Sequence, residues 1–280
     1  MAAIPPAQVA NGKTERIALI GYGAIGVAVH RLLREHAGHQ VEVVAILVRD
    51  RDRALQLAPE EAPLLVDTLP TLLGRHPTLI VECAGHGAVD DYAAAVLQAG
   101  VDLLMVSVGA LADAGREKLV LSALQRGGRK LILPSGAIGG IDWLGAARTA
   151  GLRQVTYRSR KPPQAWAGSA AEKQLDLAAI NIATLFFHGS AREAALLYPR
   201  NANVAATVAL ATLGFDDTQV ELMADPRLDA NVHEIEAEGQ GGRMALRLEG
   251  FADARNPRSS VMTAHSVVRS ILKRSASVLM

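Results

Sequence analysis

The sequence predicts an α/β protein in which a doubly wound parallel sheet is followed by a second, α+β domain. Three observations lead to this prediction. Short apolar runs alternate with helical patterns up to residue 133, a glycine triplet follows the first run, and the chain becomes rich in strands beyond residue 135. We therefore expect domains at residues 1–135 and 136–255, with a C-terminal helix within 256–280 that returns to the first domain.

The composition excludes several classes of protein. Of the 280 residues half are hydrophobic and a fifth are charged, which excludes a disordered chain. The net charge of +1 gives no attraction to nucleic acid. The single cysteine, Cys83, excludes internal disulfides and cysteine-based zinc sites, so we assign no metal and expect a cytoplasmic protein. Residues 1–15 lack the pattern of an export signal, and no apolar stretch is long enough for a membrane helix.

The first domain begins with a βαβ unit. Residues 16–20 form an apolar run, residues 25–33 carry apolar side chains at helical spacing, and residues 41–48 are apolar at nearly every position, as in a central parallel strand. The alternation then continues. We expect further strands at 79–81, 103–106 and 131–133, and helices at 89–99 and 115–125.

The second domain begins at a glycine-rich joint over residues 135–140. After a helix at 141–150, alternating patterns predict antiparallel strands. Ser190 and Glu193 fit a capping box at the start of a helix, another helix is expected at 203–213, and a last one from about Val261. The expected strands are 154–159, 184–188, 219–224, 232–237 and 243–248.

The glycine triplet carries the first indication of function. Gly21, Gly23 and Gly26 fit G-x-G-x-x-G, with Ala24 and Ile25 between the last two, in a strand-turn-helix context. These positions suit a tight turn, a close approach of backbone to a pyrophosphate, and close packing of helix on strand. The motif predicts a Rossmann-type dinucleotide-binding site.

The end of the second strand bears on the choice of dinucleotide. Asp50 suits a ribose 2′-hydroxyl, whereas Arg49 suits a 2′-phosphate, so we expect use of NAD or NADP. The alternative is that Arg49 and Arg51 are solvated loop cations. Cys83 and Ala84 follow a later strand at the ligand-binding edge, where small side chains let a nicotinamide riboside pass. We interpret Cys83 as a small buried side chain.

His233 is the candidate for chemistry in the second domain. Alternation along the strand at 232–237 places it with Ile235 and Ala237 on the apolar face. An imidazole on a covered face is either a core histidine or a site residue with a shifted pKa. The pattern alone leaves both interpretations open.

Several motifs in the same order resemble the L-aspartate dehydrogenase family, over residues 16–273. The resemblance implies NAD(P)-dependent oxidation of L-aspartate to iminoaspartate, which hydrolyses to oxaloacetate and ammonia or feeds NAD biosynthesis. It also implies that His233 is catalytic and that Ala137 and Asn203 contact the cofactor. The motifs are Gly21-Tyr-Gly-Ala-Ile-Gly26, Pro134-Ser-Gly-Ala-Ile-Gly-Gly140, Arg160-Lys161-Pro162, Tyr198-Pro-Arg-Asn-Ala-Asn-Val-Ala-Ala206, Asp225-Pro and Asn231-Val-His233.

The residue chemistry agrees with these roles. A hydride leaves Cα only when the amino nitrogen has a free lone pair, and an imidazole suits removal of the ammonium proton. For the substrate carboxylates we select Lys161, on the strand face opposite Arg158 and Arg160, although a solvated rim is an equal alternative. The backbone N–H groups at Ser135 and Gly136 are a second candidate. For Asn203, an N-cap of the helix that begins there is an alternative to the contact with the cofactor.

Two other functions fit the same pattern. One is a two-domain reductase of the homoserine dehydrogenase or dihydrodipicolinate reductase type, although no His-His pair followed by a lysine is present. The other is a non-catalytic protein that senses NAD(H). Because a strand-rich domain with an open sheet face commonly pairs with a copy of itself, we also expect a homodimer.

Overall fold

The computed structural model describes residues 14–199, 201–253, 256–276 and 278 and divides the chain into two compact units. As far as the structure describes them, unit 1 comprises Met1–Ser107, Lys118–Pro134 and Ala264–Met280. Unit 2 comprises Val108–Glu117 and Ser135–Thr263. Each unit has its own sheet.

Unit 1 contains a parallel sheet of six strands in the order β3-β2-β1-β4-β5-β6. This order is that of the doubly wound dinucleotide-binding fold, which confirms the predicted fold class. The apolar runs of the sequence form its central strands, with no exposed residue in β1, β4 or β5. The strands are β1 (Glu15–Ile20), β2 (Val41–Leu47), β3 (Leu65–Val66), β4 (Leu79–Glu82), β5 (Asp102–Met105) and β6 (Leu131–Ile132).

The connections of this sheet are helical. The helix expected at 89–99 begins earlier and includes a π-helical turn at Val89–Ala93 between α4 and α5. The short elements α2, α3 and β3 were not predicted, because α2 has seven residues, α3 five and β3 two, and their sequences show no clear periodicity. The helices are α1 (Ala24–His36), α2 (Arg51–Leu57), α3 (Leu69–Leu73), α4 (His86–Ala88), α5 (Ala94–Gln98) and α6 (Ala114–Gly127).

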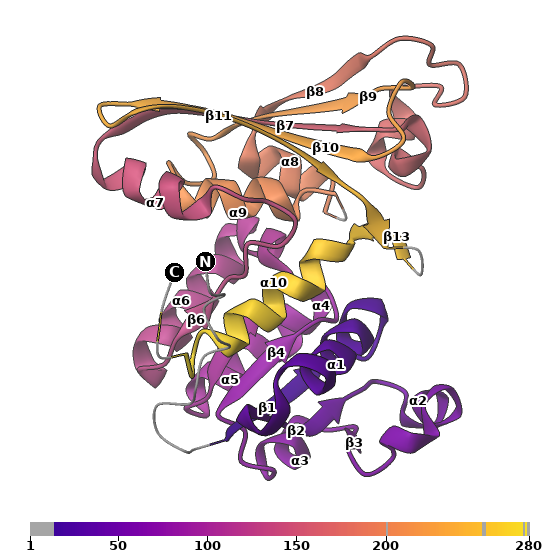
Figure 1. Ribbon diagram of the computed structural model, residues 1–280, viewed down its shortest axis with the longest axis vertical. Coiled ribbons are helices and arrows are strands. Elements are labelled where there is room, and N and C mark those ends of the chain that lie inside the picture. Colours follow the sequence, from indigo (N-terminus) through magenta and orange to yellow (C-terminus); the bar gives the residue numbers. More distant parts are fainter. Residues whose placement is uncertain (1–13, 200, 254–255, 277, 279–280) are drawn as a thin grey trace, which may run out of the picture. The chain divides into compact units, whose positions relative to one another are not determined.

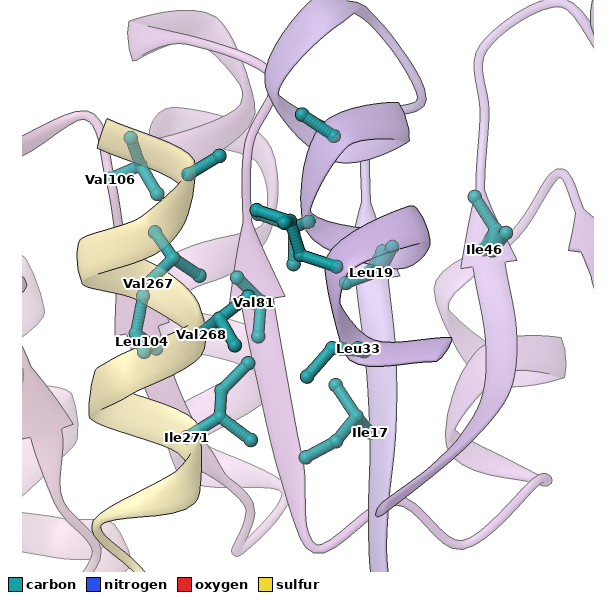
Figure 2. Packing of buried hydrophobic residues seen from close by; sticks show 14 of the residues in the cluster. Ile17, Leu19, Leu33, Ile46, Val81, Leu104, Val106, Val267, Val268 and Ile271 are labelled. Atoms are coloured by element: carbon teal, nitrogen blue, oxygen red, sulfur yellow. The ribbon is translucent and has the colours of Figure 1, made fainter. Parts of the chain in front are cut away.

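The C-terminal helix α10 (Val261–Leu272) completes the core of unit 1. Figure 2 shows Val267, Val268 and Ile271 on its inner face, beside Val81 and Leu104 of the central strands. All five side chains are at most 5% exposed. Helix α10, which is distant in sequence from these strands, therefore covers one face of the parallel sheet of unit 1.

Unit 2 is built on a mixed sheet of five strands in the order β11-β10-β7-β9-β8. Most pairs are antiparallel as expected, but β7 and β9 run parallel, which corrects the prediction of a purely antiparallel pattern. The chain crosses over between them through β8 and two helices, a connection that parallel neighbours require. The strands are β7 (Leu152–Lys161), β8 (Thr184–Ser190), β9 (Gln219–Ala224), β10 (Asn231–Gly239) and β11 (Gly242–Gly250), followed by the small pair β12 (Ala252–Asp253) and β13 (Asn256–Ser260).

Helices lie on one face of this second sheet: α7 (Ile141–Thr149), α8 (Ala191–Leu197) and α9 (Asn203–Ala211) (Figure 1). The predicted capping box is present, since the Ser190 side chain accepts from the Glu193 backbone and Glu193 bonds back to Ser190. Within the described part of the chain, no helix combines the length and apolarity needed to cross a membrane.

Candidate functional site

Unit 1 has a cavity of about 820 Å³ at the carboxyl ends of β1, β2 and β4. This edge is where doubly wound sheets bind their ligands. The structure gathers seven of the predicted cofactor residues around it: Gly21, Gly23, Ala24, Arg49, Asp50, Cys83 and Ala84. Ile25 and Gly26 lie outside this lining. The Ile25 side chain packs against the hydrophobic core, and Gly26 lies beneath the turn.

The glycine turn fits a dinucleotide for steric reasons. Gly21 has a φ of +93°, and a Cβ on it would lie 2.7 Å from the Ala84 Cβ. A Cβ on Gly26 would lie 2.3 Å from the Gly21 carbonyl oxygen, so the first turn of α1 cannot pack there with any larger residue. A Cβ on Gly23, by contrast, meets nothing within 4 Å. The open space above Gly23 is where a pyrophosphate can approach the backbone.

The charged residues after β2 have separate roles. Asp50 is the N-cap of α2, and its Oδ1 accepts from the Arg53 backbone N–H at 2.9 Å. Arg51 turns away and donates to the Leu65 carbonyl oxygen. Arg49 and Arg53 both line the cavity and are exposed. Arg53 was not among the predicted site residues, because only the α2 helix brings it beside Arg49.

A buried carboxylate shapes the loop at the far side of the cavity. Glu82, 1% exposed, accepts from the backbone N–H groups of Ala84 and Gly85 at 2.8 and 2.7 Å. It also accepts from the backbone N–H and the hydroxyl of Ser107 at 2.9 and 3.0 Å. Four donors offset the cost of burying the charge. Glu82 thus fixes the chain after β4 and ties it to the end of β5.

Cys83, interpreted from the sequence as a small buried side chain, is half-buried in the structure and lines the cavity. Burial, and to a smaller extent the charge of Glu82, raises the pKa of its thiol well above the usual value. The sulfur is therefore protonated and a poor nucleophile. Its side chain lies between the cavity and the core.

In unit 2, His233 and Lys161 share the buried face of neighbouring strands. His233 on β10 is paired with Ser159 on β7, and alternation places Tyr157, Ser159 and Lys161 on that same face. His233 and Lys161 are 5% and 7% exposed, and Ser159 is fully buried. The predicted base, His233, and the residue predicted to bind a substrate carboxylate, Lys161, therefore lie on the same face of the sheet.

The imidazole of His233 is neutral at physiological pH. Burial, and to a smaller extent the charge of Lys161, lowers its pKa to about 4. Its Nδ1 is hydrogen-bonded to the Tyr157 hydroxyl at 2.7 Å. The His233 side chain is therefore a neutral imidazole and not an imidazolium.

Lys161 is a buried cation. Burial lowers its pKa to about 8, so it remains mostly charged at pH 7. Its Nζ lies 4.8 Å from the centre of the Trp166 ring, and no acid among the described residues forms an ion pair with it. Buried charges are normally paired. A cation in this condition is suited to an anionic ligand.

The opposite face of the sheet explains why the two neighbouring arginines differ from Lys161. Arg158 pairs with Glu221, and Arg160 pairs with Asp225 at 2.6 Å, while both reach Glu234 at 3.3 Å. Their charges are occupied within the protein. This confirms that Lys161 lies opposite Arg158 and Arg160.

The remaining predicted residues lie in turns and helix starts of unit 2. Ser135, Gly136 and Ala137 occupy a half-buried turn in which the Ser135 carbonyl accepts from Ile138. Asn203 is the first residue of α9, whereas its N-cap is Ala202, which corrects the alternative of an Asn203 cap. The Asn203 Oδ1 accepts instead from the Gly109 backbone N–H at 2.9 Å. None of the described residues accepts a hydrogen bond from the Asn203 amide nitrogen, so its two N–H donors can serve another group.

Sequence reasoning missed Tyr157, Glu82 and Arg53. Tyr157 and His233 lie 76 residues apart, and only the pairing of β7 with β10 brings them together. A polar residue at alternate positions with Lys161 was the available signal for Tyr157. For Glu82 the signal was an acid at the end of an otherwise apolar strand.

Two family models match the chain. One described as aspartate dehydrogenase, C-terminal, matches residues 142–274, and one described as homoserine dehydrogenase, NAD binding domain, matches residues 21–134. An L-aspartate dehydrogenase of Ralstonia nicotianae is 44% identical over 264 residues, which cover 94% of this chain and 98% of that protein. The L-aspartate dehydrogenase of Pseudomonas aeruginosa is 45% identical, covering 91% and 96%.

Solved structures show the same likeness. Aspartate dehydrogenase from Thermotoga maritima superposes with a TM-score of 0.76 at 26% identity, covering 96% of this chain and all of that one. A homoserine dehydrogenase from Thiobacillus denitrificans gives 0.58 at 16% identity, covering 94% and 73%. The second likeness concerns the fold alone.

The sheet order, the glycine turn and its cavity define an NAD(P)-dependent oxidoreductase of the two-domain type. Many such enzymes share this first domain, so the second half of the chain decides among them. By its match there and by its relatives over more than nine-tenths of its length, the chain belongs to the L-aspartate dehydrogenase family.

Proposed function

We propose that this protein catalyses the NAD(P)-dependent oxidation of L-aspartate to iminoaspartate, which water then converts to oxaloacetate and ammonia. The observation that carries the proposal is the neutral imidazole of His233 on the same strand face as the buried ammonium of Lys161, which has no acidic partner among the described residues, in a chain of this family. A base and a cation together suit an amino acid that carries an additional carboxylate.

His233 is the general base of this proposal. L-Aspartate loses one proton from its ammonium group and a hydride from Cα, so that a C=N bond forms between that carbon and nitrogen. A bound nicotinamide supplies the acceptor for the hydride. His233 takes the proton, because it is uncharged at pH 7. Once that proton has passed from His233 to the solvent, the imidazole is neutral again and activates the water that hydrolyses the imine.

Lys161 binds one substrate carboxylate. A carboxylate beside its Nζ gives the buried cation the partner that the described residues do not supply. It also offsets the positive charge that helps to lower the pKa of His233. Substrate binding therefore makes the imidazole more basic, which assists removal of the proton.

The other proposed contacts come from backbone and amide groups. The N–H groups at Ser135 and Gly136 are assigned to the second carboxylate. Ala137 and the amide nitrogen of Asn203 are assigned to the nicotinamide end of the cofactor, since the Asn203 oxygen is already bonded to Gly109. Gly21, Gly23, Ala24, Ile25 and Gly26 are assigned to the pyrophosphate, Ile25 and Gly26 through their backbone.

We propose that both NAD and NADP are used. Only one carboxylate oxygen of Asp50 is bonded to the backbone of α2, so the other remains for a ribose 2′-hydroxyl. Arg49 and Arg53 line the same part of the cavity and suit a 2′-phosphate. We also propose a cytoplasmic homodimer, formed through the polar face of the second sheet.

The test is an assay in which the protein is mixed with L-aspartate and NAD or NADP. Reduction of the cofactor is measured by the absorbance of the reduced nicotinamide. We expect His233→Ala to lower kcat by about 10²–10⁴-fold and to leave cofactor affinity nearly intact. The matched control is His188→Ala, a histidine of β8 in the same unit. Reduction with another amino or hydroxy acid but not with L-aspartate, or cofactor binding with no turnover, would contradict the proposal.

A further inference from the structure

The inference concerns Tyr157, a buried side chain that contacts the proposed base. Tyr157 is fully buried on β7, and its hydroxyl lies 2.7 Å from Nδ1 of His233. The two rings are nearly parallel, 17° apart in plane, with centres separated by 6.0 Å. Both strands are central in the sheet, so the pair is held by main-chain hydrogen bonds on either side.

Neither partner of this hydrogen bond is ionised at physiological pH. Burial raises the pKa of the Tyr157 hydroxyl far above the physiological range, and the pKa of His233 is lowered to about 4. A neutral phenol offers one proton and an acceptor oxygen, and a neutral imidazole offers one N–H and one lone pair. Either the Tyr157 hydroxyl donates to Nδ1 of His233, or the Nδ1–H of His233 donates to the Tyr157 oxygen.

The direction decides whether His233 can act as a base. If Tyr157 donates to Nδ1, the ring proton is on Nε2, and neither nitrogen has a lone pair free for the substrate. If Nδ1–H donates to the Tyr157 oxygen, the Nε2 lone pair is free. The Tyr157 proton then needs another acceptor, and the fully buried Ser159 hydroxyl, on the same strand face and without a hydrogen-bond partner among the described residues, can supply it.

We propose that Tyr157 is a positioning residue that accepts the Nδ1–H of His233, fixes the ring orientation and leaves Nε2 as the base for the substrate. The assignment rests on the proposed function, in which His233 removes a proton. Tyr157 itself touches neither substrate nor reacting atom in this scheme. It acts through the imidazole, as the partner of the distal nitrogen does in other histidine-dependent sites.

The first test is nuclear magnetic resonance of the wild-type protein labelled with nitrogen-15 in histidine, with the His233 signals assigned from His233→Gln. We expect a protonated, pyrrole-type Nδ1 and an unprotonated, pyridine-type Nε2. The reverse assignment would overturn the inference. This measurement requires no activity and no folded Tyr157 variant, so it decides the tautomer even if L-aspartate is not the substrate.

The second test is Tyr157→Phe, which removes the hydroxyl and keeps the ring. We expect His233 to populate both tautomers and kcat to fall by at least about tenfold. This fall should be smaller than the ~10⁴-fold loss known for a histidine held in the wrong tautomer. The KM for the cofactor should stay unchanged. The matched control is Tyr198→Phe, which removes another buried hydroxyl, bonded to Gln174 in the same unit, and should leave kcat and tautomer as they are.

The outcomes separate the two proposals. Wild-type kcat and tautomer in Tyr157→Phe would overturn the positioning role while leaving the L-aspartate activity standing. A wild-type enzyme that fails to oxidise L-aspartate would contradict the proposed function, and the nitrogen signals would still show whether Tyr157 sets the tautomer.

Discussion

Replacing Lys161 by methionine should make the protein more stable and a poorer enzyme. Lys161 is 7% exposed, and its ammonium lies over the Trp166 ring with no acidic partner among the described residues. Methionine has a similar length, fills the same space and carries no charge. The penalty of burying the cation disappears, but so does the proposed ligand for a substrate carboxylate.

The magnitude follows from the pKa of this side chain. Burial lowers it from 10.5 to about 8. At about 1.36 kcal/mol for each tenfold change in acid constant, this corresponds to roughly 3 kcal/mol of folding free energy at pH 7. The lost contact with Trp166 reduces the gain, so we expect Lys161→Met to be about 1–3 kcal/mol more stable.

The stability difference between Lys161→Met and the wild type should depend on pH. Below pH 8 the lysine is charged in both the folded and the unfolded chain, so the full penalty applies. Between pH 8 and 10.5 the unfolded chain holds more protons, so the stability of the wild type rises with pH relative to the variant. The advantage of Lys161→Met should therefore be largest at pH 7 and fade towards pH 10.5.

The assays are denaturant unfolding without ligands at several pH values, and steady-state kinetics. We expect the KM for L-aspartate to rise by about 10–100-fold, the cost of one charge-assisted hydrogen bond. Lys173→Met, on an exposed lysine of the same unit, is the control and should change neither quantity. A Lys161→Met protein that is less stable at pH 7, or whose difference from wild type is the same at all pH values, would refute the reasoning.

Three further predictions follow from the site. Gly26→Ala should weaken cofactor binding at least tenfold and cost about 1–3 kcal/mol, because its Cβ would lie 2.3 Å from the Gly21 carbonyl oxygen; cofactor titration and denaturation would measure both, and unchanged affinity would contradict it. Arg49→Ala and Arg53→Ala should each raise the KM for NADP about tenfold and leave that for NAD nearly unchanged; equal effects on both cofactors would rule out a 2′-phosphate contact. His233 must stay neutral in the folded protein, so its contribution to stability should fall as pH drops from 6.5 towards 4, by ~2 kcal/mol between pH 7 and 5; a comparison with His233→Gln would show this, and parallel pH curves would exclude it.

The sequence by itself determined the features that depend on neighbours along the chain. The apolar runs predicted the central strands of the first sheet, and the spacing of Gly21, Gly23 and Gly26 predicted the turn that opens α1. The Ser190 capping box was readable for the same reason. Backbone conformation and side-chain periodicity act over a few residues, so their signal lies in the local sequence.

Only the tertiary structure decided which polar groups meet. It made β7 and β9 parallel neighbours, brought Tyr157 to His233 across β7 and β10, and placed Ser107 against Glu82. It also left Lys161 buried without an acid among the described residues. Burial and hydrogen-bond partners are set by strand order and register, which depend on contacts between residues far apart in the chain, and these set the pKa values on which the proposed chemistry depends.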